Sequence, residues 1–379
     1  MKTFVSSIFL LLFGTFCFAQ PIPTDSLYLG KTPPGNTPKI FISNAHARLA
    51  ITNNGKTIYF CQCIGDYNNT SYYKYFDNKW NGPVKLFSST VAPTLSINED
   101  TLFSMENKGA YRSFYSIQAD SGWCEPKPIS NNTLYYLQET NLGNYYFGDN
   151  NPKGGFGSWD LCKMAINNGV ITGHNLGRPV NTDNSDVEFF IAKDESFIVL
   201  GANEGGQGGR DLYISYRKKD NTWTNPKSLG NLINDGNFNK WGPFVTADNK
   251  YLFYAKAVGR PYDIYWVRFD KLLDSLKHTN YSPYVRDTIE NQNGKINHKF
   301  SYSIPDSIFY DDDGNNTLIY SASLSNGDPL PSWLKFNPNT KTLLGKPTSV
   351  ETITIKITAT DSFGASVSDV VSIFIKDKS

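Results

Sequence analysis

The sequence predicts an all-β protein that is divided into two domains. Its 379 residues are 15% aromatic and include 30 glycines and 20 prolines. Few segments show the ~3.6-residue periodicity of a helix, and many short strands separated by tight turns would have this composition. The chain is long enough for one large repeat domain and one small domain, and its character changes at Ser282. We therefore expect little helix and a domain boundary at that position.

An internal repeat organises the first domain. Five segments combine a polar turn with an aromatic-rich strand, and their starts lie about 45 to 55 residues apart. They begin at Thr52, Ser96, Thr140, Ala192 and Thr246. A unit of this length with about four short strands is the period of a propeller blade. Residues 20–281 are therefore predicted to form a five- or six-bladed β-propeller, in which Asp25–Phe41 could supply a strand that closes the ring with the last blade.

A tryptophan signature recurs in three of the units. Trp80, Trp123 and Trp223 each precede a proline by three residues. In a repeat protein, a side chain that recurs from unit to unit usually serves packing. We therefore interpret these tryptophans as packing residues of the blades and not as platforms for a sugar ring.

The repeat resembles the TolB-like (WD40-like) propeller repeats of bacterial envelope proteins. The resemblance rests on the turns Asn54-Gly55-Lys56 and Asp248-Asn249-Lys250, and on the strands that begin Asp211-Leu212-Tyr213 and Asp263-Ile264-Tyr265. It spans roughly residues 27 to 281. It implies blades stacked around a central channel in a protein of the cell envelope.

Residues 282–379 are predicted to form a β-sandwich. The stretches ITIKITAT and VSDVVSIFI alternate apolar and polar residues, and DSFG between them is typical of a hairpin turn. The region resembles the dystroglycan-type cadherin-like domain, an Ig-like fold, at Asp313-Gly314, Trp333-Leu334, Thr360-Asp361 and Ser368-Asp369, among other positions. Trp333 is expected to lie in the core, because Leu334 and Phe336 beside it are also apolar.

The cadherin-like resemblance implies calcium as a cofactor. Asp311, Asp313, Asp361 and Asp369 would supply the hard oxygen ligands that calcium takes. A solvated acidic turn is the alternative interpretation of the same residues.

One column of the aligned repeat varies in chemistry from unit to unit. Four residues before each repeated turn stand Arg48, Ala92, Tyr136, Glu188 and Gly242, with Trp241 just before the last. This column is expected to begin the innermost strand of each blade and to face the channel mouth. Constant positions of a repeat serve the fold, whereas variable ones are free to serve function. The candidate ligand-binding residues of the channel are therefore Arg48, Tyr136, Glu188 and Trp241.

Charge and motifs restrict the class of function. The net charge of +1 provides no electrostatic footprint for nucleic acid. The four histidines have no metal-ligand spacing, and neither GxSxG nor HExxH occurs, so no catalytic residue is predicted. We expect a non-catalytic binding or adhesion protein. The alternative is a propeller glycan hydrolase with an accessory sandwich, because paired carboxylates from different blades could converge in the channel. A scaffold that recruits envelope proteins is a third possibility.

The amino-terminal residues are typical of a secretory signal peptide. Residues 1–19 combine a basic start, the apolar run Ile8–Phe13 and a small residue at Ala19, so the mature chain is expected to begin at Gln20. No later segment approaches the ~20 apolar residues of a membrane span. We therefore expect export to the periplasm, the cell surface or the medium, with an envelope or extracellular protein or glycan as partner.

The cysteines leave the pairing open. Lipid attachment at Cys17 is not expected, because a large residue precedes it where a small one is needed. Cys61, Cys63, Cys124 and Cys162 would remain in the mature chain and could form disulfides in an exported protein. The sequence does not select a pairing, although Cys61 and Cys63 are poorly placed to bridge each other.

Overall fold

The structure is a computed structural model of the chain. It describes residues 27–64, 67–106, 111–130, 133–150, 154–167, 170–184, 186, 188–202, 211–236, 238–258 and 262–377. The predicted signal peptide lies outside the described residues. Among those residues, no helix is long and apolar enough to cross a membrane. The chain divides into two compact units, of which the second contains 178–180, 214–227 and everything from Lys271 onward, while the first contains the remainder.

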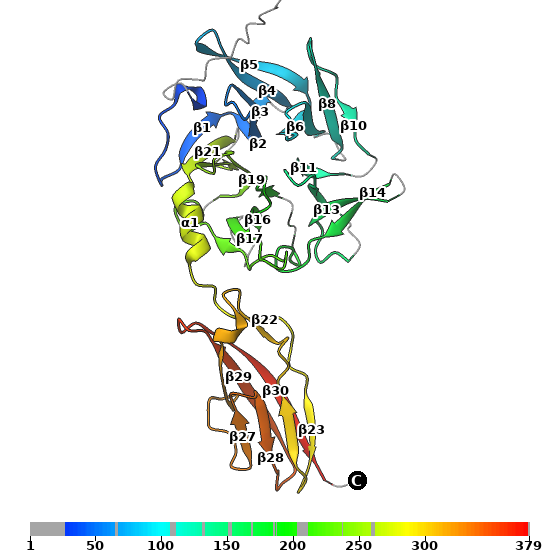
Figure 1. Ribbon diagram of the computed structural model, residues 1–379, viewed down its shortest axis with the longest axis vertical. Coiled ribbons are helices and arrows are strands. Elements are labelled where there is room, and N and C mark those ends of the chain that lie inside the picture. The colour runs from blue at the N-terminus through cyan, green and yellow to red at the C-terminus, as the bar shows by residue number, and fades with distance from the viewer. Residues whose placement is uncertain are drawn as a thin grey trace, which may run out of the picture. The chain divides into compact units, whose positions relative to one another are not determined.

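Five sheets surround a common centre and form the blades of a propeller (Figure 1). The first blade contains β2 (Ala45–Ile51), β3 (Thr57–Ile64), β4 (Tyr67–Phe76) and β5 (Lys79–Ser88). The second contains β6 (Thr90–Leu95), β7 (Thr101–Glu106), β8 (Ser113–Ala119), β9 (Gly122–Trp123) and β10 (Lys127–Pro128). The third contains β11 (Tyr135–Glu139), β12 (Tyr145–Asp149), β13 (Asp160–Asn167) and β14 (Val170–Asn175). The fourth contains β15 (Glu188–Ile191), β16 (Phe197–Ala202), β17 (Asp211–Tyr216) and β18 (Lys227–Ser228).

The fifth blade is completed by a strand from the start of the propeller. It contains β19 (Lys240–Val245), β20 (Tyr251–Lys256) and β21 (Asp263–Arg268), and β1 (Lys39–Ser43) pairs antiparallel with β21 on the outside. Phe41 is fully buried, and its ring centroid lies 4.9 Å from that of Phe253 and 5.1 Å from that of Trp266. The expected closure of the ring is therefore confirmed, and the described residues form five blades.

The recurring tryptophans pack as predicted. Trp123 Nε1 donates a hydrogen bond of 3.1 Å to the hydroxyl of Tyr59, which joins the second blade to the first. Trp80 contacts Tyr75 edge-on at 5.6 Å within its own blade, and Trp223 is buried. Their repetition therefore reflects blade packing.

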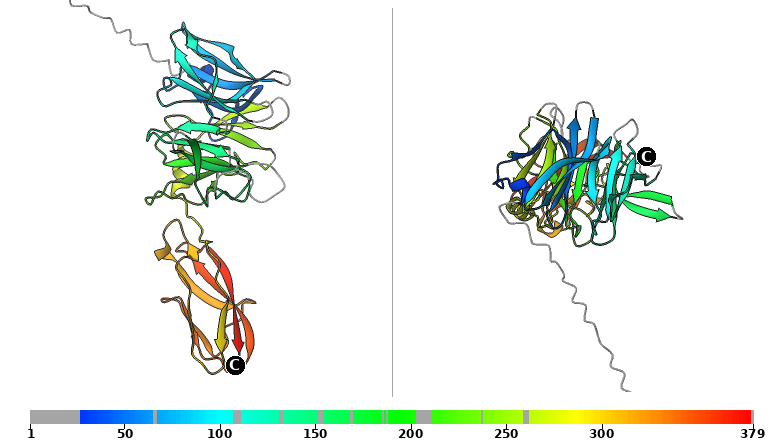
Figure 2. Two further views of the ribbon diagram at one scale, coloured as in Figure 1. Left: turned by 90° about the vertical axis from the view of Figure 1, so that its right-hand side faces the viewer. Right: turned by 90° about the horizontal axis from the view of Figure 1, so that it is seen from above.

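The second domain is an all-β sandwich, seen in the left view of Figure 2. One sheet contains β23 (Gln292–Lys295), β30 (Ser366–Lys376), β29 (Glu351–Thr360) and β26 (Ile319–Leu324). The other contains β24 (Phe300–Ser303), β28 (Thr342–Gly345) and β27 (Leu334–Asn337), and β22 (Tyr284–Val285) pairs with β25 (Phe309–Tyr310). Helices are short, as expected: α1 (Asp270–His278) and the 3₁₀ turns Tyr28–Gly30 and Asn315–Thr317.

Trp333 packs against the core of this sandwich. Its ring meets Phe300 edge-on at 6.4 Å, and Nε1 donates a hydrogen bond of 2.9 Å to Glu351 Oε1. A Cβ added at Gly345 would lie 2.1 Å from the carbonyl oxygen of Trp333. The Trp333 backbone therefore approaches β28 so closely that only glycine fits, and the expected packing role is confirmed.

Cys61, Cys124 and Cys162 are free thiols, and they should differ sharply in reactivity. Burial raises the pKa of Cys61 and raises that of Cys162 to about 12, whereas Cys124 is exposed. Because the thiolate is the reactive form, maleimide should label Cys124 rapidly, and Cys61 and Cys162 only after denaturation, as read by peptide mass spectrometry. Labelling of Cys61 at the rate of Cys124 in the native protein would contradict this burial.

Candidate functional site

The five residues of the variable column lie on the innermost strands. Arg48, Ala92, Tyr136, Glu188 and Gly242 belong to β2, β6, β11, β15 and β19, the first strand of each blade. All five are buried, and Arg48, with a relative exposure of 1%, is among the largest fully buried side chains of the described chain. The column therefore forms a layer at the centre of the propeller.

A bulge in the first blade gives Arg48 its position. In β6 two residues, 92 and 93, lie opposite Ser104 of the next strand. In β2 the register passes from His46–Cys61 to Ala50–Tyr59, which leaves three residues, 47–49, opposite one. Bulges re-aim side chains and occur next to functional sites. The bulge in β2 is therefore one residue longer than the bulge in β6. It directs the long cationic side chain of Arg48 into the central layer.

The Arg48 guanidinium is buried without a hydrogen-bond acceptor. It lies over the ring of Tyr136, with Cζ 4.6 Å from the ring centroid, and 5.7 Å from that of Phe189. Its Nε, Nη1 and Nη2 have no hydrogen-bond partner among the described residues. Burial lowers the pKa of Arg48 to about 10, although Tyr136 and Glu188 act in the opposite direction. Buried polar groups normally have partners, so this cation is an exception that needs an explanation.

Glu188 is held by other groups of the central layer. Its Oε2 accepts a hydrogen bond of 3.0 Å from the Gly242 amide, and its Oε1 accepts one of 3.2 Å from the Tyr135 hydroxyl. A Cβ added at Gly201 would lie 2.8 Å from Glu188 Cβ. Glu188 therefore joins the third, fourth and fifth blades near Arg48.

Trp241 belongs to a separate aromatic cluster. Its ring centroid lies 5.5 Å from that of His46 and 5.1 Å from that of Tyr262. Its Nε1 is buried and makes no hydrogen bond within the described chain. The structure brings Arg48, Tyr136 and Glu188 together in the central layer, whereas the ring contacts of Trp241 are with His46 and Tyr262. Of the four predicted residues, only Arg48 lines the pocket described next.

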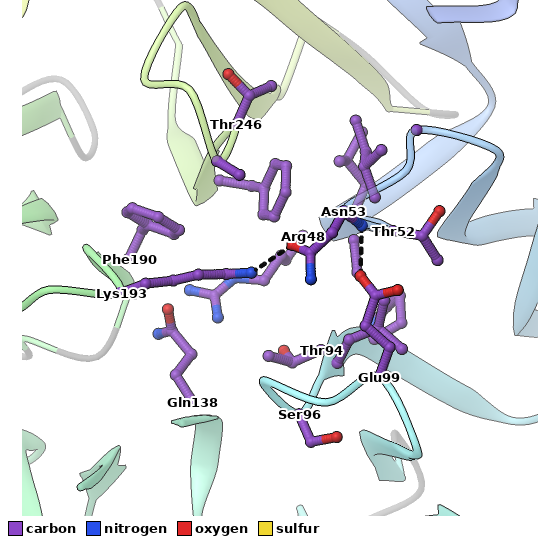
Figure 3. Close-up of a pocket in the computed structure, with 18 of the residues that line it drawn as sticks. Arg48, Thr52, Asn53, Thr94, Ser96, Glu99, Gln138, Phe190, Lys193 and Thr246 are labelled. Atoms are coloured by element: carbon purple, nitrogen blue, oxygen red, sulfur yellow. Dashed lines mark hydrogen bonds between the residues drawn. The ribbon is translucent and has the colours of Figure 1, made fainter. Parts of the chain in front are cut away.

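A pocket of about 280 Å³ lies where the innermost strands run into the repeated turns (Figure 3). Arg48 lines it, whereas Tyr136 and Glu188 contribute to the layer around Arg48 without lining the pocket themselves. Thr94 Oγ1 is a second buried polar atom of the lining that has no hydrogen-bond partner in the described residues. Much of the remaining wall is apolar: Leu49, Ala50, Ile51, Pro93, Leu95, Phe190, Ile191 and Phe244.

The repeated turns supply lining residues that the sequence did not single out. Lys193 Nζ donates a hydrogen bond of 2.7 Å to Asn53 Oδ1, and the Asn53 amide donates one to Glu99 Oε1 (Figure 3). Burial lowers the pKa of Lys193, while the charge of Glu99 opposes that shift. A comparison of the second turn position across the repeat could have singled out Asn53 and Lys193 as candidates, though not their contact, because that position also varies: Asn53, Ile97, Asn141, Lys193 and Ala247.

The other carboxylates of the pocket have protein donors. Glu139 Oε2 accepts from the Ile97 amide at 2.8 Å, and its Oε1 accepts from the Tyr145 hydroxyl at 2.8 Å. Asp248 Oδ1 accepts from the Thr246 hydroxyl at 2.6 Å. These hydrogen bonds stabilise the turns around the pocket.

In the sandwich, the predicted calcium residues are brought together in part. Asp311 is buried, its Oδ1 accepts the Asp313 amide at 2.8 Å, and its Oδ2 has no hydrogen-bond partner among the described residues. Burial raises the pKa of Asp311, and nearby charges, first Asp313 and then Asp361, raise it further. Asp369 instead accepts the Ile289 amide at 2.8 Å. Of the four acids, Asp313 and Asp361 therefore lie close enough to Asp311 to raise its pKa.

The same acids have protein donors of their own. Asp361 Oδ1 accepts the amides of Phe363 and Ala365, each at 2.8 Å, and its Oδ2 accepts from Asn280 at 2.8 Å. Hydrogen bonding, led by that of Asn280, lowers the pKa of Asp361. Over the described segments, no group of three or more His, Cys, Asp or Glu side chains is arranged to hold a metal ion.

Comparison with known proteins supports the division of the fold. Residues 282–376 match the family described as "Putative Ig domain". No curated protein matches the chain. TolB from Acinetobacter baumannii is a similar solved structure, with a TM-score of 0.41 and 12% identity; it covers 59% of this chain, which spans 54% of it. The periplasmic gluconolactonase of Pseudomonas aeruginosa has a TM-score of 0.36 and 9% identity, with coverages of 87% and 85%.

A shorter match concerns a structure titled as a putative α-galactosidase from Bacteroides fragilis. It has a TM-score of 0.20 and 20% identity, and it covers 26% of this chain, which spans 18% of it. These distant likenesses concern the fold alone. The class is an all-β protein in which a five-bladed propeller precedes an Ig-like domain.

Proposed function

We propose that this chain is an exported, non-catalytic binding protein of the cell envelope or surface, and that its propeller binds a ligand in the central pocket. The observation that carries the proposal is the pocket itself: a largely apolar wall beside the buried Arg48, whose guanidinium has no hydrogen-bond acceptor among the described residues. Concave, largely apolar pockets with a few polar groups are typical of ligand sites.

The same pocket argues against the hydrolase alternative. A glycosidase needs two carboxylates placed on either side of the scissile bond, one of them free to transfer a proton. Both oxygens of Glu139 accept protein hydrogen bonds, and Glu99 is bound to the Asn53 amide. The predicted hydrolase would therefore have to break turn contacts in order to use either acid.

Filling the pocket should abolish binding and leave the fold intact. A panel of neutral oligosaccharides, short peptides and small organic acids should contain ligands that raise the melting temperature of the full chain, because a ligand that binds the folded state stabilises it by about 3 kcal/mol at a hundred times its Kd. Thr94→Phe should remove the shift, whereas Thr352→Phe, at an exposed position of β29, should keep it. Release of reducing sugar from an oligosaccharide at a rate that Glu99→Gln and Glu139→Gln abolish would favour the hydrolase instead.

We propose that the sandwich binds calcium through Asp311. Asp311 Oδ2 is buried and has no hydrogen-bond partner in the described part of the chain, which fits a hard cation better than it fits a solvated turn. Asp313 and Asp361 act on Asp311, and their carboxylates would have to turn from their present hydrogen bonds in order to join it as ligands. Calcium, when bound, would neutralise the charge that these acids accumulate around Asp311.

Calcium should therefore stabilise the full chain. For a site with Kd near 10⁻⁴ to 10⁻³ M, 5 mM calcium should contribute about 1–2 kcal/mol, which is a rise of a few degrees in the melting temperature of the sandwich. Asp311→Asn should abolish the rise, while Asp306→Asn, at an exposed acid that pairs with Lys341, should not. If calcium does not change the melting curve of the unmodified chain, these acids have a purely structural role.

A further inference from the structure

We propose that the ligand of the propeller pocket carries a carboxylate, which binds the Arg48 guanidinium, and that the rest of the ligand is a small apolar body. This inference rests on the proposed function and names the chemistry of its ligand. The carboxylate would belong to a free small acid or to the end of a peptide.

Arg48 offers the pocket a buried positive charge. Its three guanidinium nitrogens are buried and have no acceptor among the residues that the structure describes, and the cation–π contact with Tyr136 at 4.6 Å uses the face of the guanidinium and not its edge. Arginine binds carboxylates through two parallel hydrogen bonds from that edge. The site therefore provides the donor half of such a pair.

Other charged groups lie near Arg48 or line the pocket. Glu188 acts on Arg48, but its two oxygens accept from Gly242 and Tyr135. The lining acids Glu99, Glu139 and Asp248 each accept a protein hydrogen bond, as described above. The lining cation Lys193 comes from the fourth blade and binds the neutral Asn53 side chain of the first blade. A ligand anion is thus the acceptor that Arg48 lacks, with Lys193 as a second positive charge.

The size and polarity of the space restrict the rest of the ligand. A volume of about 280 Å³ is at the lower end of the ~300–1,000 Å³ range of ligand pockets. Leu49, Leu95, Phe190 and Phe244 line it, and they suit an apolar chain better than a hydroxylated sugar. Thr94 Oγ1 adds one donor without a partner. The pocket therefore fits a short acyl or side-chain group that ends in a carboxylate.

The experiment compares acids with their isosteric amides on the full chain. Hexanoate and hexanamide test a free small acid, and acetyl-Ala-Leu and its carboxy-terminal amide test a peptide end. Calorimetric titration should show at least tenfold tighter binding of one acid over its amide. The pair with the tighter acid identifies the source of the carboxylate.

Variants of the two cations separate ligand binding from structure. Arg48→Met should weaken the binding of the tighter acid at least tenfold and should raise the melting temperature of the unliganded chain by a few degrees, because it removes an unpaired buried charge. If Arg48 had a purely structural role, Arg48→Met would lower the melting temperature instead. Lys193→Met, which leaves the central layer intact, should weaken binding several-fold, and Lys335→Met, on β27 of the sandwich, should change nothing.

The outcomes distinguish this inference from the proposed function. If neutral ligands bind in a manner that Thr94→Phe abolishes, and acids bind no more tightly than amides, the carboxylate is overturned while the binding function stands. If no probe or panel ligand binds, both are overturned. A fall in the melting temperature of Arg48→Met, together with equal affinity for acids and amides, assigns Arg48 to the core.

Discussion

Gly242→Ala should destabilise the propeller by about 3 kcal/mol. A Cβ at Gly242 would lie 2.6 Å from the Arg48 amide nitrogen and 2.7 Å from the Ala47 carbonyl carbon, and backbone atoms cannot move aside as a flexible side chain can. Overpacking of this kind costs about 1–3 kcal/mol, and the left-handed conformation, with φ +58° here, adds about 1 kcal/mol for a non-glycine residue. Urea unfolding followed by tryptophan fluorescence would measure the loss, since six of the seven tryptophans lie before residue 282.

Gly143→Ala is the matched control for that substitution. Gly143 has a similar φ of +73°, but nothing lies within 4 Å of the Cβ that alanine would add. It should lose only the conformational part, about 1 kcal/mol. Equal losses for the two alanines would mean that the close approach of β19 to β2 does not decide the stability of the ring.

Glu195→Ala should lower the free energy of unfolding by a similar amount, about 3–5 kcal/mol, for an electrostatic reason. The Glu195 carboxylate is fully buried and accepts hydrogen bonds from Thr140 Oγ1 at 2.7 Å, Asn144 Nδ2 at 2.6 Å and Tyr146 Oη at 2.9 Å. Alanine would leave buried donors of the third blade without their charged acceptor, and each such loss costs about 1–3 kcal/mol. Urea unfolding of the full chain would again measure the change.

Asp194→Ala provides the comparison from the adjacent position. Asp194 is exposed, and its Oδ1 accepts only from the amide and hydroxyl of Ser196, two residues later. Its removal should change the free energy of unfolding by less than about 1 kcal/mol. Comparable losses at the two positions would show that Glu195 does not link the third and fourth blades.

The repeat made the fold predictable, because each blade carries its own turn and aromatic strand. Trp123 and Trp333 were placed correctly for the same reason: their local neighbours in sequence already predict a packed environment. Blade number was left between five and six. It was settled by the pairing of Lys39 with Trp266, two residues more than 200 positions apart.

For the site, the sequence predicted which repeat positions lie on the innermost strands, but not how their side chains are arranged. Alignment placed Arg48 on an innermost strand, but not the longer bulge that distinguishes β2 from β6. Lys193 was missed because its role depends on Asn53 of a different blade, a contact that no local pattern encodes. Trp241 was included because it neighbours Gly242, yet alternate residues of a strand face opposite ways. Asp369 accepts the Ile289 amide, and it is not among the charges that act on Asp311.

The pairing of β1 with β21 also determines the order in which the chain can fold. A polypeptide that crosses a membrane amino-terminus first presents Lys39–Ser43 early, while the partner strand Asp263–Arg268 emerges near the end of the propeller. Until then, the early strand has no partner and the ring cannot shut, so closure is a late step with a large loop-closure entropy. After β21 emerges, its unpaired edge, DIYWVR, is an aromatic template for pairing with a second chain. A chaperone that occupies this edge, or rapid docking of β1, would therefore decide between a closed ring and aggregation of the newly made chain.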